Sequence, residues 1–142
     1  MLRVRHLLHR KGYDVWSVDV DEPVLEAIQI MADRHIGALP VLRNGELAGM
    51  VSERDYARKV ILLGRSSAET SVWEIMTSPV VTVGPGEDIH RCMELMTEQR
   101  IRHLPVIEEG RMVGVISIGD LVRAVIEEQQ ETITQLERFI TG

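Results

Sequence analysis

Two four-residue segments of the chain place a serine three positions before an aspartate. They are Ser52-Glu53-Arg54-Asp55 and Ser117-Ile118-Gly119-Asp120. At the start of a helix this spacing is close to a capping box, worth about 1 kcal/mol per cap. The same geometry suits a ligand, because a helix N-terminus attracts phosphate and an aspartate can accept two hydrogen bonds from a ribose diol. The residues alone leave capping and ligand binding both open.

A second candidate group precedes the sequence Leu-Pro-Val, which occurs twice. Arg102 and His103 stand before one occurrence, whereas Gly37 and Ala38 stand before the other. Neighbours on a strand point to opposite faces, so one of the two basic residues is expected to face a cleft and the other water or the core. An arginine offers phosphate a fixed fork of donors. Because Gly37 and Ala38 carry no charge, we expect the two sites to differ.

Both groups belong to a long internal repeat. "LPVLRNGELAGMVSERD" (Leu39–Asp55) returns as "LPVIEEGRMVGVISIGD" (Leu104–Asp120), 65 positions later. The offset holds without a gap when Val15–Ile61 is laid on Val80–Ile126. A repeat of this length indicates two copies of one structural unit.

Each copy shows the same order of local signals. A β-prone stretch (Val15–Val18, Val80–Val83) precedes an amphipathic helix, then two strands joined by a tight turn at Asn44-Gly45 or Gly110, and a closing helix. The closing helices are predicted over about 53–63 and 119–129. One β-α-β-β-α unit of about 50 residues would bury too little surface alone. We therefore predict an α/β (α+β) fold of two pseudo-symmetric units packed sheet to sheet.

The segments outside the repeats complete the predicted organisation. "RVRHLL" and "SVWEIM" are candidate lead-in helices, which align only with a shift of three further residues. In the tail, Ile133, Leu136 and Ile140 have helical spacing. We expect the tail either to pack on a partner subunit or on the N-terminal segment, or to fray. The predicted parts are a lead-in helix (1–14), repeat 1 (15–63), a linker with a second lead-in (64–79), repeat 2 (80–127) and a helical tail (128–142).

Composition excludes several classes of function. The 142 residues are 44% hydrophobic and 27% charged, with a net charge of −6 that argues against general nucleic-acid binding. The charged N-terminus does not resemble a signal peptide, and no aliphatic run is long enough to span a membrane. The single cysteine, Cys92, lies on an apolar helix face and is predicted to be buried and unreactive. We expect a cytoplasmic protein.

The doubled pattern "LPV-h-x-x-G-x-h-x-G-h-h-S-x-x-D", with h for a hydrophobic residue, resembles a tandem pair of cystathionine-β-synthase-type (CBS) domains, a Bateman module. The resemblance covers about Val15–Ile126. It implies a regulatory module and not an enzyme. Such a module binds an adenine nucleotide in clefts between the two repeats. AMP or NAD(H) is the first candidate, with ADP, ATP and S-adenosylmethionine as others. It also implies a homodimer and, in trans, a protein effector of unknown identity.

The resemblance also assigns roles to residues. Asp55 and Asp120 would hold the ribose, with Ser52, Arg54, Ser117 and Gly119 near ribose or phosphate. Basic residues at the positions of Arg102 and His103 would contact phosphate. The adenine pocket and its surroundings would include Ser17, Val18, Gly37, Ala38, Thr82, Val83, Leu104 and Pro105. The valines are equally explained as core, and we expect composite sites in which the aspartate of one repeat faces the first strand of the other.

Other residues carry weaker signals. Gly49 and Gly114 lie inside predicted strands, where either helix packing or a closely approaching nucleotide would explain them. The histidines lack the spacing of a zinc site, and no catalytic motif is present, so no metal and no enzymatic activity are predicted. The methionines are expected to fill the core. The alternative to nucleotide sensing is a ligand-free dimerisation scaffold with the same fold.

Overall fold

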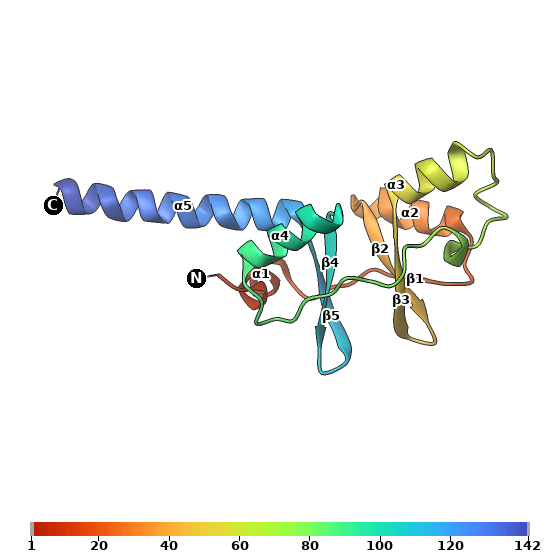
Figure 1. The fold of residues 1–142 in the computed structure, drawn as a ribbon, viewed down its shortest axis with the longest axis horizontal. Coiled ribbons are helices and arrows are strands. Elements are labelled where there is room, and N and C mark those ends of the chain that lie inside the picture. Colours follow the sequence, from red (N-terminus) through yellow and green to blue (C-terminus); the bar gives the residue numbers. More distant parts are fainter. Residues whose placement is uncertain (1, 142) are drawn as a thin grey trace. The chain divides into compact units, whose positions relative to one another are not determined.

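The computed structural model describes residues 2–141 and has the mixed α/β character expected from the sequence (Figure 1). In chain order the elements are α1 (Val4–Lys11), β1 (Val18–Asp19), α2 (Val24–Arg34), β2 (Ala38–Arg43), β3 (Glu46–Ser52), α3 (Glu53–Tyr56), the π-helix η1 (Ala57–Ile61), the 3-10 helix η2 (Val72–Glu74), α4 (Ile89–Gln99), β4 (His103–Glu108), β5 (Arg111–Ser117) and α5 (Ile118–Thr141).

These elements form two compact units that do not follow the order of the chain. Asp14–Val81 form one unit, called here the repeat-1 unit. Residues 2–13 pack with residues 82–141 in the other, the repeat-2 unit. The N-terminal helix is therefore part of the unit that contains the second repeat.

The sheets confirm the predicted hairpins. β2 and β3 pair antiparallel, as do β4 and β5. Asn44 and Gly45 connect the first pair with φ of 52° and 80°, and Glu109 and Gly110 connect the second with φ of 51° and 77°. Positive φ at both central residues matches the turn type that fits the twist of a hairpin.

The first strand of each repeat is shorter than predicted. β1 contains only Val18–Asp19, which pair in parallel with Val41 and Leu42 of β2. In the other unit a single parallel bridge joins Val83 to Val106. The predictions of strands over Val15–Val18 and Val80–Val83 were wrong in extent, because the preceding residues have no neighbouring backbone to pair with.

The closing helices also differ from expectation. The helix predicted over 53–63 is α-helical only through α3 and continues as the π-helix η1. The helix predicted over 119–129 extends to Thr141 as α5, a 24-residue helix. The prediction that the tail continues the last helix is confirmed, and Figure 1 shows α5 running well past α4.

The two lead-in segments are exchanged between the repeats. In the repeat-2 unit, the Val4 backbone N–H donates to the Glu87 carbonyl at 2.9 Å. In the repeat-1 unit, the Val72 N–H donates to the Glu22 carbonyl at 2.8 Å. Glu22 and Glu87 are 65 positions apart, whereas Val4 and Val72 are 68 apart, so the three-residue shift in the lead-in alignment is confirmed. Each repeat is covered by the segment that precedes the other.

The strand glycines are explained by this covering. A Cβ at Gly114 would lie 2.5 Å from Cδ2 of Leu8 in α1. A Cβ at Gly49 would lie 2.6 Å from Sδ of Met76 and 3.0 Å from the Thr77 carbonyl. Of the two explanations left open by the sequence, the structure shows packing of the lead-in segments.

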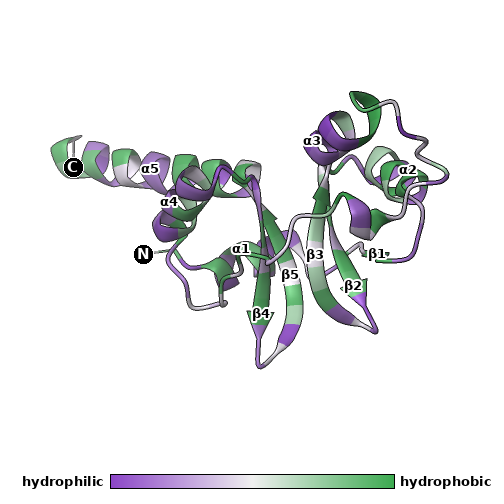
Figure 2. Cartoon of the chain, turned by 45° about the vertical axis from the view of Figure 1, so that its right-hand side comes forward, coloured by the Kyte–Doolittle hydropathy of each residue, from purple (hydrophilic) through white to green (hydrophobic). Residues whose placement is uncertain are grey.

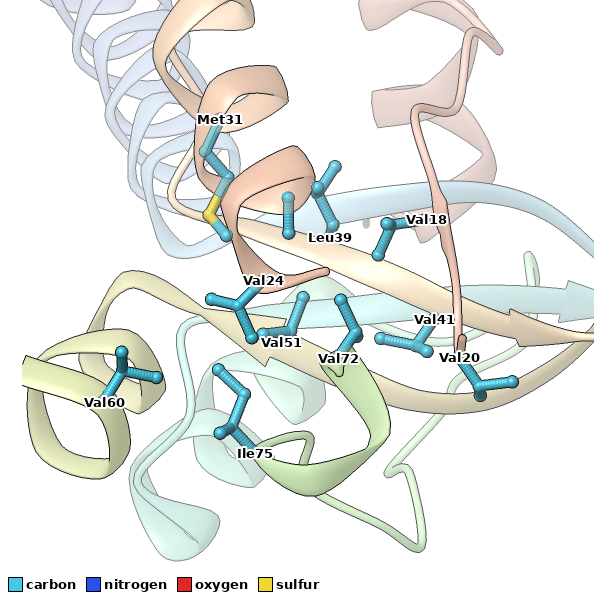
Figure 3. Packing of buried hydrophobic residues seen from close by; sticks show 11 residues of the cluster. Val18, Val20, Val24, Met31, Leu39, Val41, Val51, Val60, Val72 and Ile75 are labelled. Atoms are coloured by element: carbon cyan, nitrogen blue, oxygen red, sulfur yellow. The ribbon is translucent and has the colours of Figure 1, made fainter. Parts of the chain in front are cut away.

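Aliphatic side chains fill the core of the repeat-1 unit, and Figure 3 shows how those of the lead-in meet those of the sheet. Val72 and Ile75 of the lead-in pack towards Val51 of β3 (Figure 3). The strands are hydrophobic along most of their length and hydrophilic at the hairpin tips (Figure 2). Met31 and Met96 are buried as expected. Four other methionines that were expected to fill the core are half-buried: Met50, Met76, Met93 and Met112.

Candidate functional site

The serine–aspartate segment of repeat 1 forms a complete capping box. The Ser52 Oγ accepts a hydrogen bond from the Asp55 backbone N–H at 3.1 Å, while Oδ2 of Asp55 accepts from the Ser52 N–H at 2.9 Å. The Ser52 hydroxyl also donates to Oδ2 at 3.0 Å. Capping therefore explains both residues, and it fixes the carboxylate at the point where α3 leaves β3.

The segment of repeat 2 repeats this geometry. Oδ2 of Asp120 accepts from the Ser117 N–H at 2.8 Å, and the Ser117 Oγ accepts from the Asp120 N–H at 3.2 Å. The side chains of Asp55 and Asp120 are each 13% exposed. Both carboxylates are thus held rigidly and keep a small accessible surface.

Each aspartate also has a lysine partner, which the sequence analysis missed. Nζ of Lys59 lies 3.2 Å from Oδ1 of Asp55, and Nζ of Lys11 lies 2.7 Å from Oδ2 of Asp120. The lysines are anchored by carbonyls, Lys59 on Ile75 at 2.9 Å and Lys11 on Val115 at 2.7 Å. Lys59 stands four positions after Asp55, a spacing that could have predicted the pair. Lys11 is 109 positions from Asp120, so no local signal was available.

These contacts set the charge state of Asp120. Burial opposes ionisation and is the largest single influence, but hydrogen bonds from Lys11 and Ser117 outweigh it and hold the pKa of Asp120 below its ordinary value. A carboxyl whose pKa is depressed by folding stabilises the native state above the unfolded-state pKa. That contribution disappears as the pH falls through the native-state pKa.

We therefore expect acid to destabilise the native chain more than the Asp120→Asn variant. Chemical unfolding between about pH 5 and pH 3 should show a steeper fall in the free energy of unfolding for the parent. Asp33→Asn, on the exposed face of α2, is the matched control and should keep the parental slope. Equal slopes for the parent and Asp120→Asn would contradict the proposed role of the Asp120–Lys11 pair.

The residues before Leu-Pro-Val lie beside the capping boxes. The strand register pairs Ala38 with Ser52 and His103 with Ser117. The carbonyls of Gly37 and Arg102 accept the N–H groups of Glu53 and Ile118, at 3.0 and 2.9 Å. One helix-terminal N–H in each unit is therefore already bonded to the protein. Each unit brings its predicted strand-start and helix-start residues together.

Arg102 and His103 differ in environment. Arg102 is exposed, while His103 is half-buried. Burial is the main influence that lowers the pKa of His103, with Lys11 acting in the same direction and Asp120 against it. The imidazole near Asp120 therefore favours its neutral form.

The residues predicted around adenine fall into two groups. Val18 and Val83 are 3% and 6% exposed and lie in the cores of their own units, and Leu104 and Pro105 are also buried. Ser17 is half-buried and Thr82 is exposed. Of these six residues, Ser17 and Thr82 are therefore the ones whose side chains keep appreciable solvent-accessible surface.

Cys92 is fully buried on α4. Burial, assisted by the negative charges of Glu87 and Asp88, raises the pKa of its thiol to about 11. Because the thiolate is the reactive form, we expect alkylation of the native chain at pH 8 to be at least about a hundredfold slower than in the guanidinium-unfolded chain. Iodoacetamide labelling followed by mass spectrometry measures both rates. Comparable rates would show that α4 opens readily.

The described residues also bear on metal binding and on membrane insertion. Across residues 2–141, no three His, Cys, Asp or Glu side chains gather as metal ligands would. In the same part of the chain, no helix combines the length and apolarity required to cross a membrane.

The family model for the CBS domain matches residues 4–61 and 72–127. The chain belongs to the CBS-domain family. Pairs of CBS domains are regulatory modules, and the resemblance inferred from the doubled pattern is confirmed. Both matches begin in a lead-in segment, at Val4 and Val72, the two residues that make the equivalent hydrogen bonds described above.

Individual CBS proteins show how far the similarity extends. The mitochondrial CBS domain-containing protein CBSX3 of Arabidopsis thaliana is 46% identical over 136 residues, which cover 92% of this chain and 66% of that protein. YhcV of Bacillus subtilis is 33% identical over 107 residues, covering 75% of this chain and 76% of YhcV. This chain thus spans about two thirds to three quarters of the length of these relatives.

Solved structures confirm the fold. A protein with CBS domains from Burkholderia ambifaria superposes with a TM-score of 0.87 at 47% identity, covering 90% of this chain and 96% of that one. The CBS domain pair of protein MJ0100, solved with 5′-methylthioadenosine and S-adenosyl-L-methionine, gives a TM-score of 0.80 at 23% identity, with coverage of 90% and 98%. At this identity the second similarity establishes the fold alone.

Proposed function

We propose that this chain is a non-catalytic sensor of an adenosine-containing nucleotide, with AMP or NAD(H) as the first candidates. The observation that carries the proposal is the pair of equivalent capping boxes. Each holds a carboxylate, 13% exposed, at a helix start beside a lysine. A carboxylate accepts hydrogen bonds from a ribose diol, and an adjacent cation suits phosphate.

The residues divide the ligand between them. Asp55 and Asp120 bind ribose hydroxyls, with Ser52, Arg54, Ser117 and Gly119 alongside. Arg102 and His103 give the repeat-2 unit a phosphate contact that Gly37 and Ala38 do not supply in repeat 1. Ser17, Val18, Thr82 and Val83 contribute to the adenine pockets.

Ligand binding changes the relation between the two repeats and so the contact with a protein effector in trans. The module acts as a homodimer in the cytoplasm. The adenosine ligands bound by the MJ0100 pair support this choice of ligand class for a module of the same fold.

A thermal-shift panel tests the proposal. Ligand at about a hundred times its dissociation constant should stabilise the fold by roughly 2.7 kcal/mol. AMP, ADP, ATP, NAD, NADH and S-adenosylmethionine form the panel, GMP is the control for base recognition, and product analysis of the same samples detects turnover. If no adenosine compound raises the melting temperature, the proposal is wrong; turnover would contradict the non-catalytic assignment.

One observation favours the alternative of a ligand-free dimerisation scaffold. Both aspartates already satisfy their helix starts and are paired with lysines. A scaffold needs nothing further from them. The same panel separates the two functions, since a scaffold shows no nucleotide-dependent stabilisation.

A further inference from the structure

Helix α5 carries a row of exposed aliphatic side chains that nothing in its own unit covers. Ile126 is 59% exposed, Leu136 57% and Ile140 81%. Val122 and Ile133 continue the row at 41% and 47% exposure. Hydrophobic and hydrophilic segments alternate along the whole helix (Figure 2).

The spacing of this row is that of a coiled-coil seam. Ile126, Ile133 and Ile140 are seven residues apart, and Val122, Gln129 and Leu136 stand four positions before them. Apolar residues alternating at intervals of three and four keep one narrow stripe facing a partner helix. Leu121 and Ala124, on another side of α5, are buried within the repeat-2 unit.

The end of α5 requires support that its own unit does not give. From Gln129 to Thr141 every described residue is exposed except Thr134, which is half-buried. Helical segments of this length are marginal in water without packing. The exposed seam is therefore the surface through which a partner would stabilise the helix.

We propose that the partner is α5 of a second copy of this chain, packed antiparallel. A two-fold symmetric contact requires a self-complementary surface. When the helices run in opposite directions, Ile126 packs against Leu136 of the partner subunit. Ile140 packs against Val122 of the partner subunit, and the full length of the seam is covered.

Charge selects the antiparallel direction. Arg123 and Glu137 lie on the same flank of the seam, 14 positions apart and both exposed. In the antiparallel arrangement each Arg123 meets Glu137 of the partner subunit, which forms two ion pairs. In a parallel pair, residues of one flank face the opposite flank of the partner, so these charges do not meet. On the second flank, Val125 meets Phe139 of the partner subunit.

The charge of the helix also disfavours a membrane surface as the occupant. From residue 127 to the end of α5 there are four acidic residues and one basic residue, Arg138; the acidic residues are Glu127, Glu128, Glu131 and Glu137. Amphipathic helices that bind anionic lipid carry basic residues on the polar face. A second copy of α5 satisfies both the seam and the flanking charges.

A charge swap in the full chain tests the contact. Arg123→Glu and Glu137→Arg should each raise the dimer dissociation constant about tenfold, because each turns two exposed attractions into repulsions. The double variant should return it to within about twofold of the parent. Sedimentation equilibrium at low salt measures all four proteins. Single variants without effect, or a double variant as weak as the singles, would overturn the proposal.

A spin label at position 140 tests the direction. Antiparallel packing places the two labels about 27 Å apart along the axis, since 18 residues separate Ile140 from Val122. Parallel packing would bring them within about 10 Å of each other. A short distance, or none, would overturn the proposal. Nucleotide binding is read separately by thermal shift, so failure of this contact leaves the sensor function standing.

Discussion

The Gly114→Ala variant is expected to unfold with a free energy about 2 kcal/mol below that of the parent. The added Cβ would lie 2.5 Å from Cδ2 of Leu8, a distance that real contacts do not reach, and Leu8 is only 1% exposed and has nowhere to move. Urea unfolding followed by circular dichroism measures the change. Gly86→Ala is the control, since nothing lies within 4 Å of a Cβ there.

Leu8 itself completes the test. Leu8→Ala should cost about 3 kcal/mol through the cavity that it leaves. In the double variant Leu8→Ala/Gly114→Ala, the new methyl group enters that cavity, so the double loss should be smaller than the sum of the single losses. Additive losses, or equal effects of alanine at Gly114 and Gly86, would contradict the packing of α1 on β5.

The second large effect concerns binding. If the proposed function is correct, Asp120→Ala should weaken nucleotide affinity at the repeat-2 carboxylate by about a hundredfold, because two hydrogen bonds to a charged acceptor are lost. Asp55→Ala should do the same at the other carboxylate. Isothermal titration calorimetry measures both, with whichever compound the panel identifies.

Both variants also lose the hydrogen bond that the aspartate accepts from the serine N–H in the capping box, which costs about 1 kcal/mol of stability. Asp88→Ala controls for this loss, because Asp88 caps α4 by accepting the His90 N–H at 2.7 Å and belongs to no proposed site. Reduced affinity in Asp120→Ala but not in Asp88→Ala supports ribose binding. Retained affinity in both aspartate variants would assign the carboxylates to capping alone.

The sequence predicts the local structure well because the signals are local. The dipeptide Asn44-Gly45 predicts a tight turn by itself. Apolar residues three and four positions apart predict the helices α2 and α4. The first strands were overpredicted for the same reason: β-propensity at Val15–Val18 says nothing about whether a neighbouring strand exists. The internal repeat strengthened the predicted order of helices and strands, since the same order of signals occurs in both copies.

The site was predictable only in part. The capping boxes follow from serine and aspartate at a fixed spacing, and the structure forms both. The ion pair of Lys11 with Asp120 depends on how α1 packs, and no pattern near either residue encodes it. The meaning of Gly49 and Gly114 also depended on the lead-in segments, whose targets lie far away in the chain.

Because each repeat packs against the lead-in segment that precedes the other, the folding of each repeat depends on the other half of the chain. A cut in the linker at about residue 65 would leave a front half whose α1 has lost its target and whose repeat has lost Val72 and Ile75. The back half would lack Val4 and Leu8 in turn. Neither half should therefore fold independently, although each contains one intact repeat. When the two halves are mixed, each should supply the lead-in segment that the other repeat needs, so that both units fold.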